Sequence, residues 1–517
     1  MFNVTDELKR GIQLQEAGDL IQAEAIYRQV LDAEPRELNA LFRLAVLCQL
    51  QGRAAEAAPL YQRLLALQPG SVQAQNNLGL TLATLGRLDE ALACCEEAVR
   101  LRPDCAEFLN NLGTIQNTRG NLDEAADAFR RALALDGRYL AAWRNLGMLQ
   151  LKVADRRGVP TSPHPRRADD VHLDEAVRCL RAALALQPAN VLVLNALGLA
   201  LFSLGQSVEA GDCFHRALSL RPDDAEAGFN LARVWMTLKK WPEAASCLRH
   251  VLAHHPDDAR VLAALGHIFS CHLPNHAEAQ GYFQRLLAVS PNDTKARLMI
   301  EALSGAAQPS QLPADLMVAQ YNASADEWDQ VVLQRGDRSQ AWLRAALEPG
   351  PKHAELAVLD LGCGTGLSGL QFRAWAATLI GVDQSPGMLA KARARGIYDE
   401  LIEADLLTAL HERPDRFDLI IASDVLLLLG DLGPLFHAVQ RALRPGGRFA
   451  FTVDTLEGEG EGDYRLTVWL QYAHSRAYLA RLAAQTRMEV VSAREVVHAR
   501  DDGGSAPGLV VVLQRST

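Results

Sequence analysis

The segment Val358-Leu359-Asp360-Leu361-Gly362-Cys363-Gly364-Thr365-Gly366 decides the fold of the C-terminal part of this chain. An apolar run closes on an acidic residue and three alternating glycines, just before a segment that can begin a helix. Glycines at this spacing let the backbone turn sharply and approach a ligand closely, and the N-terminus of the following helix offers unpaired N–H groups to a negative group. A dinucleotide fingerprint has its third glycine one place later, where Leu367 stands here. The segment therefore predicts a cofactor-binding turn and does not favour NAD.

Apolar runs and acidic residues recur after this turn at the intervals of a doubly wound nucleotide-binding domain. The second run ends at Asp383, where a carboxylate can accept hydrogen bonds from both hydroxyls of a ribose. The third ends at Asp405, and a helix is expected to begin at Ser385-Pro386. The segment Leu443-Arg444-Pro445-Gly446-Gly447-Arg448 predicts a turn into a fifth strand. The strands expected after the first cover residues 378–382, 400–404, 417–423 and 449–453.

These features together resemble the class I S-adenosylmethionine-dependent methyltransferases, which have alternating glycines behind an acidic residue and an L-R-P-G-G turn before the fifth strand. The resemblance implies an α/β Rossmann-like domain with a seven-stranded sheet, and S-adenosyl-L-methionine as the cofactor. It implies that Asp383 binds the ribose and that Asp405-Leu406 holds the adenine amino group. The residues that it places around the cofactor are Asp360, Gly362, Gly364, Gly366, Asp383, Gln384, Met388, Asp405, Leu406 and Ser423. No metal site is expected.

Upstream of this domain the same positions return every 34 residues, from 77 to 111 for example. Asn77-Leu78-Gly79 recurs as Asn111-Leu112-Gly113 and later as Ala196-Leu197-Gly198, each followed at fixed distances by two alanines and a helix-ending Pro or Gly. Small residues let two antiparallel helices pack closely, and Pro ends the second helix. The large residues expected to fill the gap are Tyr27, Tyr61, Phe129 and Phe214. The pattern resembles the tetratricopeptide repeat and predicts an all-α solenoid.

Eight repeat units are predicted, and the fifth is interrupted by an insertion. A solenoid exposes a long concave surface that usually binds extended peptides or other proteins, so a protein or peptide partner is expected. The insertion, residues 154–174, contains three prolines and four arginines and predicts a solvated loop. The predicted units begin near Val4, Leu38, Val72, Ala106, Leu140, Val191, Ala225 and Ala259.

The length of 517 residues exceeds what one hydrophobic core organises, so two domains are expected. The predicted division is a solenoid over 1–305, a linker and helical lead-in over 306–354, and a methyltransferase domain over 355–517. The lead-in contains Tyr321-Asn322-Ala323-Ser324-Ala325-Asp326-Glu327-Trp328-Asp329, which resembles a segment common in small-molecule methyltransferases. There the tyrosine lies over the cofactor. Tyr321 has either that role or an ordinary role in helix packing.

The segment after the fourth strand bears on the methyl acceptor. It lacks the Asn/Asp-Pro-Pro-Tyr/Phe motif that would specify an amide or adenine nitrogen. The sequence there, Ser423-Asp424-Val425-Leu426-Leu427-Leu428-Leu429-Gly430-Asp431, resembles the A-D-V-L-x-Y-x-G-D segment of predicted methyltransferases that carry tetratricopeptide repeats. Leu428 stands where those proteins have an aromatic residue. Asp424 either orients a substrate or caps the loop.

His474 is the candidate acid or base. It lies in Gln471-Tyr472-Ala473-His474-Ser475-Arg476-Ala477-Tyr478, which resembles an (R/Q)-Y-A-H-S-x-x-Y segment of the same repeat-bearing methyltransferases and is expected to begin a helix. Imidazole changes protonation near neutral pH, and the loop after the fifth strand lies at the substrate mouth of this fold. The alternative is that His474 caps the helix.

Two further segments complete the domain. The charged, glycine-rich residues 457–463 predict either a plain loop or a mobile lid. Residues 489–499 and 509–513, on either side of Asp502-Gly503-Gly504, predict a hairpin that supplies antiparallel sixth and seventh strands.

Composition narrows the class of protein. The formal charge of −10 argues against binding nucleic acid as the main function. The N-terminal residues show no charged and then apolar leader, and no stretch approaches the roughly 20 apolar residues of a membrane span, so a cytoplasmic location is expected. Nine cysteines without C-x-x-C spacing predict reduced core residues, and Cys363 a small residue in the turn.

Two functions from different classes remain open. The first is an enzyme that passes a methyl group to a small-molecule or protein acceptor entering near Tyr321 and His474, with the repeats recruiting a protein partner or substrate. The second is a non-catalytic tetratricopeptide scaffold with a cofactor-sensing or vestigial methyltransferase domain. Every expected cofactor residue is present, which favours the enzyme.

Overall fold

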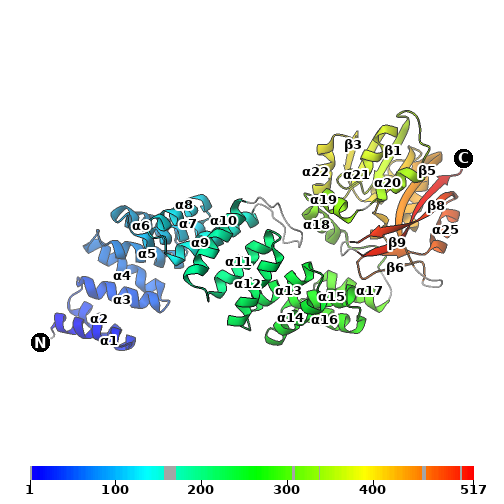
Figure 1. Ribbon diagram of the computed structural model, residues 1–517. Coiled ribbons are helices and arrows are strands. Elements are labelled where there is room, and N and C mark those ends of the chain that lie inside the picture. The colour runs from blue at the N-terminus through cyan, green and yellow to red at the C-terminus, as the bar shows by residue number, and fades with distance from the viewer. Residues whose placement is uncertain (1–2, 157–170, 306–308, 337, 457–461, 501–503) are drawn as a thin grey trace. The chain divides into compact units, whose positions relative to one another are not determined.

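The computed structural model describes residues 3–156, 171–305, 309–336, 338–456, 462–500 and 504–517. The chain forms two compact units, Met1–Pro256 and Asp257–Thr517, of which the first is helical and the second contains the sheet (Figure 1). This division by contacts falls earlier than the predicted boundary after Gly305. The reason is that the last repeat helices pack against the α/β domain. The boundary drawn from the repeat pattern stays a prediction.

The first unit is a series of antiparallel helix pairs, as the repeat pattern predicts. The pairs begin at Val4, Leu38, Val72, Ala106, Leu140, Val191 and Ala225, which are the predicted starts of the first seven units. The helices are α1 Val4–Glu16, α2 Leu20–Ala33, α3 Leu38–Leu50, α4 Ala54–Leu67, α5 Val72–Thr84, α6 Leu88–Leu101, α7 Ala106–Arg119, α8 Leu122–Leu135, α9 Leu140–Arg156, α10 Val171–Leu186, α11 Val191–Ser203, α12 Ser207–Leu220, α13 Ala225–Thr237 and α14 Trp241–His254. Most of the insertion predicted as a loop, residues 157–170, lies outside the described residues.

Within a repeat, a glycine on the first helix receives an aromatic ring from the second. A Cβ on Gly113 would lie 2.8 Å from Phe129 Cε1, and one on Gly198 would lie 2.6 Å from Phe214 Cε1. Both distances are far below the 3.5–4.0 Å at which carbon atoms pack, so only glycine admits the ring. Phe129 and Phe214 are fully buried. The predicted pairing of small and large residues is confirmed.

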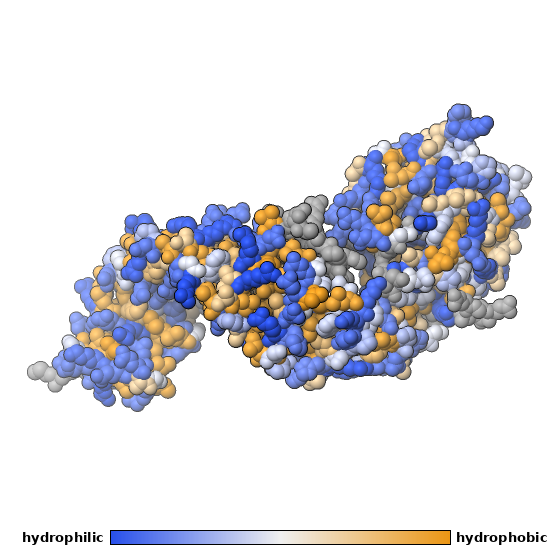
Figure 2. All heavy atoms as spheres, in the orientation of Figure 1, coloured by the Kyte–Doolittle hydropathy of each residue, from blue (hydrophilic) through white to orange (hydrophobic). Residues whose placement is uncertain are grey.

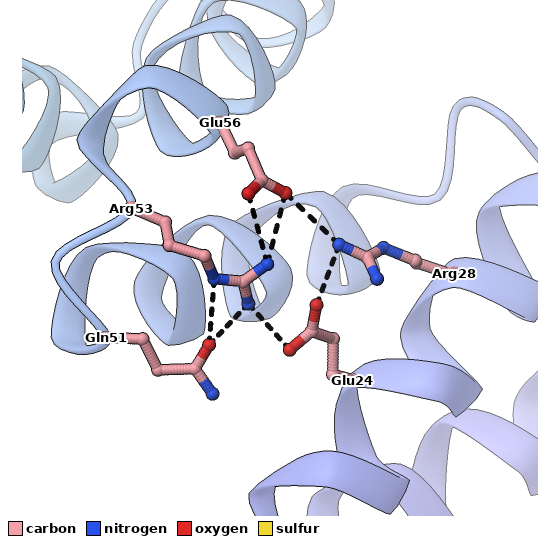
Figure 3. A network of polar contacts seen from close by, with 5 residues as sticks. All are labelled: Glu24, Arg28, Gln51, Arg53 and Glu56. Atoms are coloured by element: carbon pink, nitrogen blue, oxygen red, sulfur yellow. Dashed lines mark hydrogen bonds and ion pairs between the residues drawn. The ribbon is translucent and has the colours of Figure 1, made fainter.

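Between repeats, polar side chains tie neighbouring units together. The Asn111 side chain donates a hydrogen bond to Asn76 Oδ1 and the Asn145 side chain donates to Asn110 Oδ1, both over 3.0 Å. Figure 3 shows a second link, in which Glu24 accepts from Arg28 and Arg53, and both arginines also reach Glu56. Glu24 lies on the first repeat and Glu56 on the second. A network of several charges stabilises more than an isolated surface ion pair would.

The second unit begins with the eighth predicted repeat. Its helices are α15 Ala259–Cys271 and α16 His276–Val289, followed by α17 Thr294–Ser304. Leu298 of α17 packs in one buried cluster with Leu312, Leu466 and Tyr472 of the α/β domain. Tyr472 also donates from its hydroxyl to the carbonyl of Pro309 over 2.6 Å. The last helices of the repeat region are therefore part of the core that supports the sheet.

The lead-in to the α/β domain is helical, as expected, and consists of α18 Ala314–Ser324, α19 Trp328–Arg335 and α20 Ser339–Ala346. The sheet has the order β3-β2-β1-β4-β5, with β9 antiparallel to β5 and β8 antiparallel to β9. Its strands are β1 Leu356–Leu361, β2 Ala376–Asp383, β3 Glu400–Glu403, β4 Phe417–Ala422, β5 Leu443–Thr455, β6 Tyr464–Leu466, β7 Tyr472–His474, β8 Met488–Ala499 and β9 Ser505–Arg515. The remaining helices are α21 Leu367–Phe372, α22 Pro386–Arg395, α23 Leu406–His411, α24 Gly433–Ala442 and α25 Arg476–Gln485.

The seven main strands confirm the predicted topology, and two details differ. β5 begins at Leu443, because Leu443 already pairs with Phe417 of β4 ahead of a bulge. The short strands β6 and β7 were not expected, and β7 pairs with the last two residues of β5. The parallel register aligns Leu361 with Val382, so the carboxyl ends of β1 and β2 lie side by side. In this fold ligands bind at that edge.

The surface of each unit is mixed. Figure 2 shows hydrophilic residues over much of the visible face, with apolar residues in separate patches. The most exposed large apolar side chains, Ile21, Leu333 and Val171, lie on different helices. No helix in the described part of the chain is both long and apolar enough to cross a membrane.

Candidate active site

A cavity of about 510 Å³ lies at the carboxyl ends of β1, β2 and β4. Its walls come from the glycine turn after β1, the ends of β2 and β4, the lead-in helices and the end of β8. This volume and this position are typical of a small-molecule site in an open α/β sheet.

The glycine turn forms one wall with its backbone. Gly362 has a φ of 65°, and a Cβ there would lie 2.4 Å from Val425 Cγ2. Gly364 has a φ of 53°, and its N–H donates to Asp383 Oδ2 over 2.9 Å. An L side chain rarely adopts this left-handed conformation, which explains the glycines. The turn is thereby closed against the end of β2.

The Asp383 carboxylate is held at the cavity wall by backbone donors. Its Oδ1 accepts from the N–H of Ser385 over 2.8 Å, so each carboxylate oxygen has a backbone donor. Burial raises the pKa of Asp383, and the backbone N–H groups oppose that shift. A carboxylate at the cavity wall is a group that could accept hydrogen bonds from the hydroxyls of a ribose.

Asp405 has a structural role as well as a place in the cavity. It caps α23, where its Oδ1 accepts from the N–H groups of Leu407 and Thr408, each over 3.0 Å. Burial alone would raise its pKa, but hydrogen bonds from the hydroxyl and N–H of Thr408 and the N–H of Leu407 lower it overall. The carboxylate is thus held ionised as an acceptor, which suits the amino group of an adenine.

Most residues predicted around the cofactor do line the cavity, and two do not. Asp360 lies behind the turn, where it is fully buried and accepts from the hydroxyl of Tyr398 over 2.7 Å. Burial raises its pKa to about 7. Gly366, with φ 95°, begins α21 and faces Tyr398 and Arg395. These two residues lie behind the cavity lining and support the turn, and their direct contact with a cofactor stays a prediction. The predicted residues that line the cavity are Gly362, Gly364, Asp383, Gln384, Met388, Asp405, Leu406 and Ser423.

The lead-in segment is fastened over the cavity by its own polar residues. Asn322 Oδ1 accepts from the Ser385 hydroxyl over 2.6 Å and from the N–H of Gly387 over 2.9 Å. Asp329 accepts from the hydroxyl of Thr365 in the glycine turn and pairs with Arg395. Between these two attachments Tyr321 lines the cavity and packs edge-on against Trp328, with ring centroids 5.3 Å apart. Tyr321 therefore takes part in helix packing and lies at the cavity wall, and its place over a cofactor stays a prediction.

Asp424 lines the cavity in a fixed orientation. Its φ is 56°, and its N–H donates to Thr452 Oγ1 over 2.9 Å. Its Oδ1 accepts from the hydroxyl of Ser339 over 2.9 Å. Ser339 and Thr452 are almost completely buried, so these contacts are protected from water. A carboxylate held this way at the cavity wall is suited to orienting a substrate.

The expected position of His474 is wrong. His474 ends β7 instead of lying in a helix, and the helix begins at Arg476 with Ser475 as its cap. The imidazole is fully buried and does not line the cavity. Its Nε2 lies 2.9 Å from the carbonyl of Leu429 and 3.1 Å from that of Gly430, which a neutral ring donates to. Burial lowers its pKa to about 4. His474 thus supports the loop after β4 and is not placed to exchange a proton with a substrate.

The far end of the cavity has residues that the sequence did not single out. His498 and Arg500, at the end of β8, line it together with Asp454 of β5. His498 Nδ1 lies 2.6 Å from Asp454 Oδ1, and Arg500 Nη2 lies 3.5 Å from Asp454 Oδ2. In the sequence, the sign of this part of the site was the presence of two basic residues, His498 and Arg500, just before the predicted hairpin turn. Residues 457–461, part of the segment predicted as a loop or a lid, lie outside the described residues.

Comparison with known proteins supports this architecture. A family model described as a methyltransferase domain matches residues 358–447. Models described as tetratricopeptide repeat match residues 8–72, 51–104, 76–139 and 172–225, and residues 208–268.

Similar proteins are methyltransferases. A trans-aconitate 2-methyltransferase of Methylobacterium nodulans is 36% identical over 211 residues, which cover 40% of this chain and 72% of that protein. A malonyl-[acyl-carrier protein] O-methyltransferase of Pseudescherichia vulneris is 35% identical over 26% of this chain and 53% of that protein, so the chain spans about half of its length. A solved S-adenosylmethionine-dependent methyltransferase of Mesorhizobium loti is 26% identical, with a TM-score of 0.29 over 34% of this chain and 96% of that one. The chain belongs to this methyltransferase family and carries tetratricopeptide repeats ahead of its methyltransferase domain.

Proposed function

We propose that the protein transfers a methyl group from S-adenosylmethionine to a small-molecule or protein-borne acceptor. The observation that carries the proposal is the cavity wall in which Gly362, Gly364, Asp383 and Asp405 meet. When bound there, S-adenosylmethionine supplies an activated methyl group, which the acceptor atom takes while the sulfur keeps the electron pair of the broken bond.

The residues of the chain position the cofactor and the acceptor and exclude water. Asp383 and Asp405 bind the ribose and the adenine amino group, and the glycine backbone leaves room for close approach. Leu312, Met317 and Val318 of the lead-in line the cavity and limit access of water. Asp424 orients the acceptor. Positioning and exclusion of water are sufficient for displacement at an activated methyl group, so no strong base is required.

The names of similar proteins and the presence of the repeats support the choice of acceptors to test. The similar proteins are named for trans-aconitate and for a malonyl group on acyl-carrier protein. A small acid and a carrier-borne acyl group are therefore the acceptors to test first. A carrier protein or another protein substrate would be recruited by the tetratricopeptide repeats, which form concave peptide-binding surfaces.

The test is calorimetric titration of S-adenosylhomocysteine into the wild type, Asp383→Ala and a control, Asp326→Ala. Loss of the ribose hydrogen bonds should weaken binding to Asp383→Ala by roughly 1 to 3 kcal/mol. Asp326→Ala should bind as the wild type does, because the Asp326 side chain is 88% exposed and does not line the cavity. A folded wild type that does not bind S-adenosylhomocysteine would contradict the enzyme and favour the scaffold.

A further inference from the structure

The charges along the cavity wall are uneven. Five aspartates line it: Asp383, Asp405, Asp424, Asp431 and Asp454. Among the described lining residues, the basic ones are His498 and Arg500, and both lie at the end of β8. A negatively charged ligand would therefore be repelled along most of the wall and attracted at this one end.

Arg500 is mostly buried at that end and packs against an aromatic ring. Its side chain is 15% exposed, and its guanidinium lies over the ring of Trp469 at 5.2 Å from the centroid. Trp469 is itself packed edge-on against His267 and His272, with centroids 6.2 and 5.8 Å away. Cys271 Sγ approaches the carbonyl of Val468 at 3.5 Å. The end of the cavity is thus supported by α15 of the last repeat.

The guanidinium has more donors than its neighbours take up. It carries five N–H groups, and its contact with Asp454 is long at 3.5 Å. Arg500 Nη1 is buried and has no hydrogen-bond partner among the described residues. A buried charged donor without an acceptor is costly, and a planar carboxylate is the group that matches its geometry.

We propose that Arg500 binds a carboxylate of the methyl acceptor and thereby fixes the acceptor in the cavity. This rests on the proposed function. A carboxylate engaged by an arginine is a poor nucleophile, so it serves as an anchor, and the atom that receives the methyl group belongs to a second functional group near Asp424. The acceptor class is accordingly an organic acid with at least two polar groups.

The test uses the full-length protein saturated with S-adenosylhomocysteine. Trans-aconitate, malonate and glutarate are titrated by calorimetry at millimolar concentration, beside the uncharged trimethyl ester of trans-aconitate. At least one acid should bind saturably and the ester should not. Arg500→Gln should weaken binding of that acid by about tenfold or more. Arg500→Lys, which keeps the charge but not the two parallel N–H donors of the guanidinium, should weaken it by less.

Two controls separate this result from misfolding. Arg494→Gln removes an exposed arginine from the same strand and should leave acid binding unchanged. Arg500→Gln should keep the wild-type affinity for S-adenosylhomocysteine. Equal binding of the acid by the wild type and Arg500→Gln would overturn the proposal, as would a wild type that binds S-adenosylhomocysteine but none of the acids. Failure to bind S-adenosylhomocysteine would instead refute the proposed function.

Discussion

The repeats and the α/β unit differ in how far apart in sequence the contacting residues lie. In the repeats, Gly113 packs under Phe129, 16 positions along, and Asn111 bonds Asn76, 35 positions away. In the second unit, Ser339 bonds Asp424 across 85 positions and Tyr472 bonds Pro309 across 163. A change in a repeat should therefore be felt by its neighbours alone, whereas one in the second unit should reach from the lead-in to the cavity.

Truncation gives the largest expected effect and tests this difference directly. A fragment of residues 313–517 removes Leu298 and leaves the Tyr472 hydroxyl and the N–H groups of Gly430 and Asp431 without the carbonyls of Pro309 and Ser310. The lost packing and hydrogen bonds should lower the free energy of unfolding by roughly 5 kcal/mol relative to a fragment of residues 257–517. Urea unfolding of both fragments measures it. Equal stability would show that α17 contributes nothing to the core.

Gly362→Ala should have the next largest effect. A left-handed alanine costs roughly 1 to 2 kcal/mol, and the overlap with Val425 adds a comparable amount, so about 3 kcal/mol is expected. Gly364→Ala is the matched control, because φ is also positive there but no heavy atom lies within 4 Å of the added Cβ. Its cost should be the smaller of the two in denaturant unfolding. A larger destabilisation by Gly364→Ala would mean that the Val425 side chain moves away from the added Cβ without an energetic penalty.

His474 makes the stability of the second unit depend on pH. Its pKa is lowered by burial from 6.5 to about 4, so between these values the unfolded chain binds a proton that the folded chain does not. His474 therefore does not lower the free energy of unfolding well above pH 6.5. As the pH falls, protonation of the unfolded chain lowers this free energy, by about 2 kcal/mol at pH 5. Asp360, with its pKa raised from 3.8 to about 7, acts in the opposite direction over this range.

The effect of His474 is isolated by comparison with His474→Gln, in which the side chain can still donate to the carbonyl of Leu429. On lowering the pH from 7.5 to 5, the free energy of unfolding should change by about 2 kcal/mol more in the destabilising direction in the wild type than in the variant, because the opposing effect of Asp360 is common to both proteins. Parallel pH profiles would show that His474 is not a buried neutral group in solution. Binding of S-adenosylhomocysteine at pH 7.5 should be the same in both proteins.

Substitutions of glycine in the repeats should have the smallest effects and opposite signs. Gly113→Ala places a Cβ 2.8 Å from Phe129 and should destabilise the first unit by about 1 kcal/mol, even after the gain in helix propensity. Gly281→Ala, on α16 with open space around it, should stabilise by roughly 0.5 to 1 kcal/mol. Thermal unfolding measures both. A stabilising Gly113→Ala would mean that the ring of Phe129 moves aside freely.

The sequence predicted features that depend on residues close in sequence better than features that depend on distant residues. The repeat starts and the turns at strand ends are local or recurrent patterns, and the structure has them where expected. The environments of His474 and Arg500 depend on partners far away in sequence, Leu429 for one and Trp469 with α15 for the other. The helix expected at His474 begins later because Ser475, a preferred N-cap residue, caps it, and His474 pairs with β5 instead. Neither partner could be read from a local motif.

The two attachments of the lead-in, Asn322 to the start of α22 and Asp329 to the glycine turn, have a kinetic consequence. If the proposed cofactor binds beneath this segment, opening of the two attachments would widen its way out. We expect the rate of that opening to limit steady-state turnover, so that a first turnover on preloaded enzyme is faster than those that follow. Asn322→Ala would then raise the steady-state turnover rate while weakening binding of the cofactor. In that case the lead-in would set the rate of turnover as well as form a wall of the site.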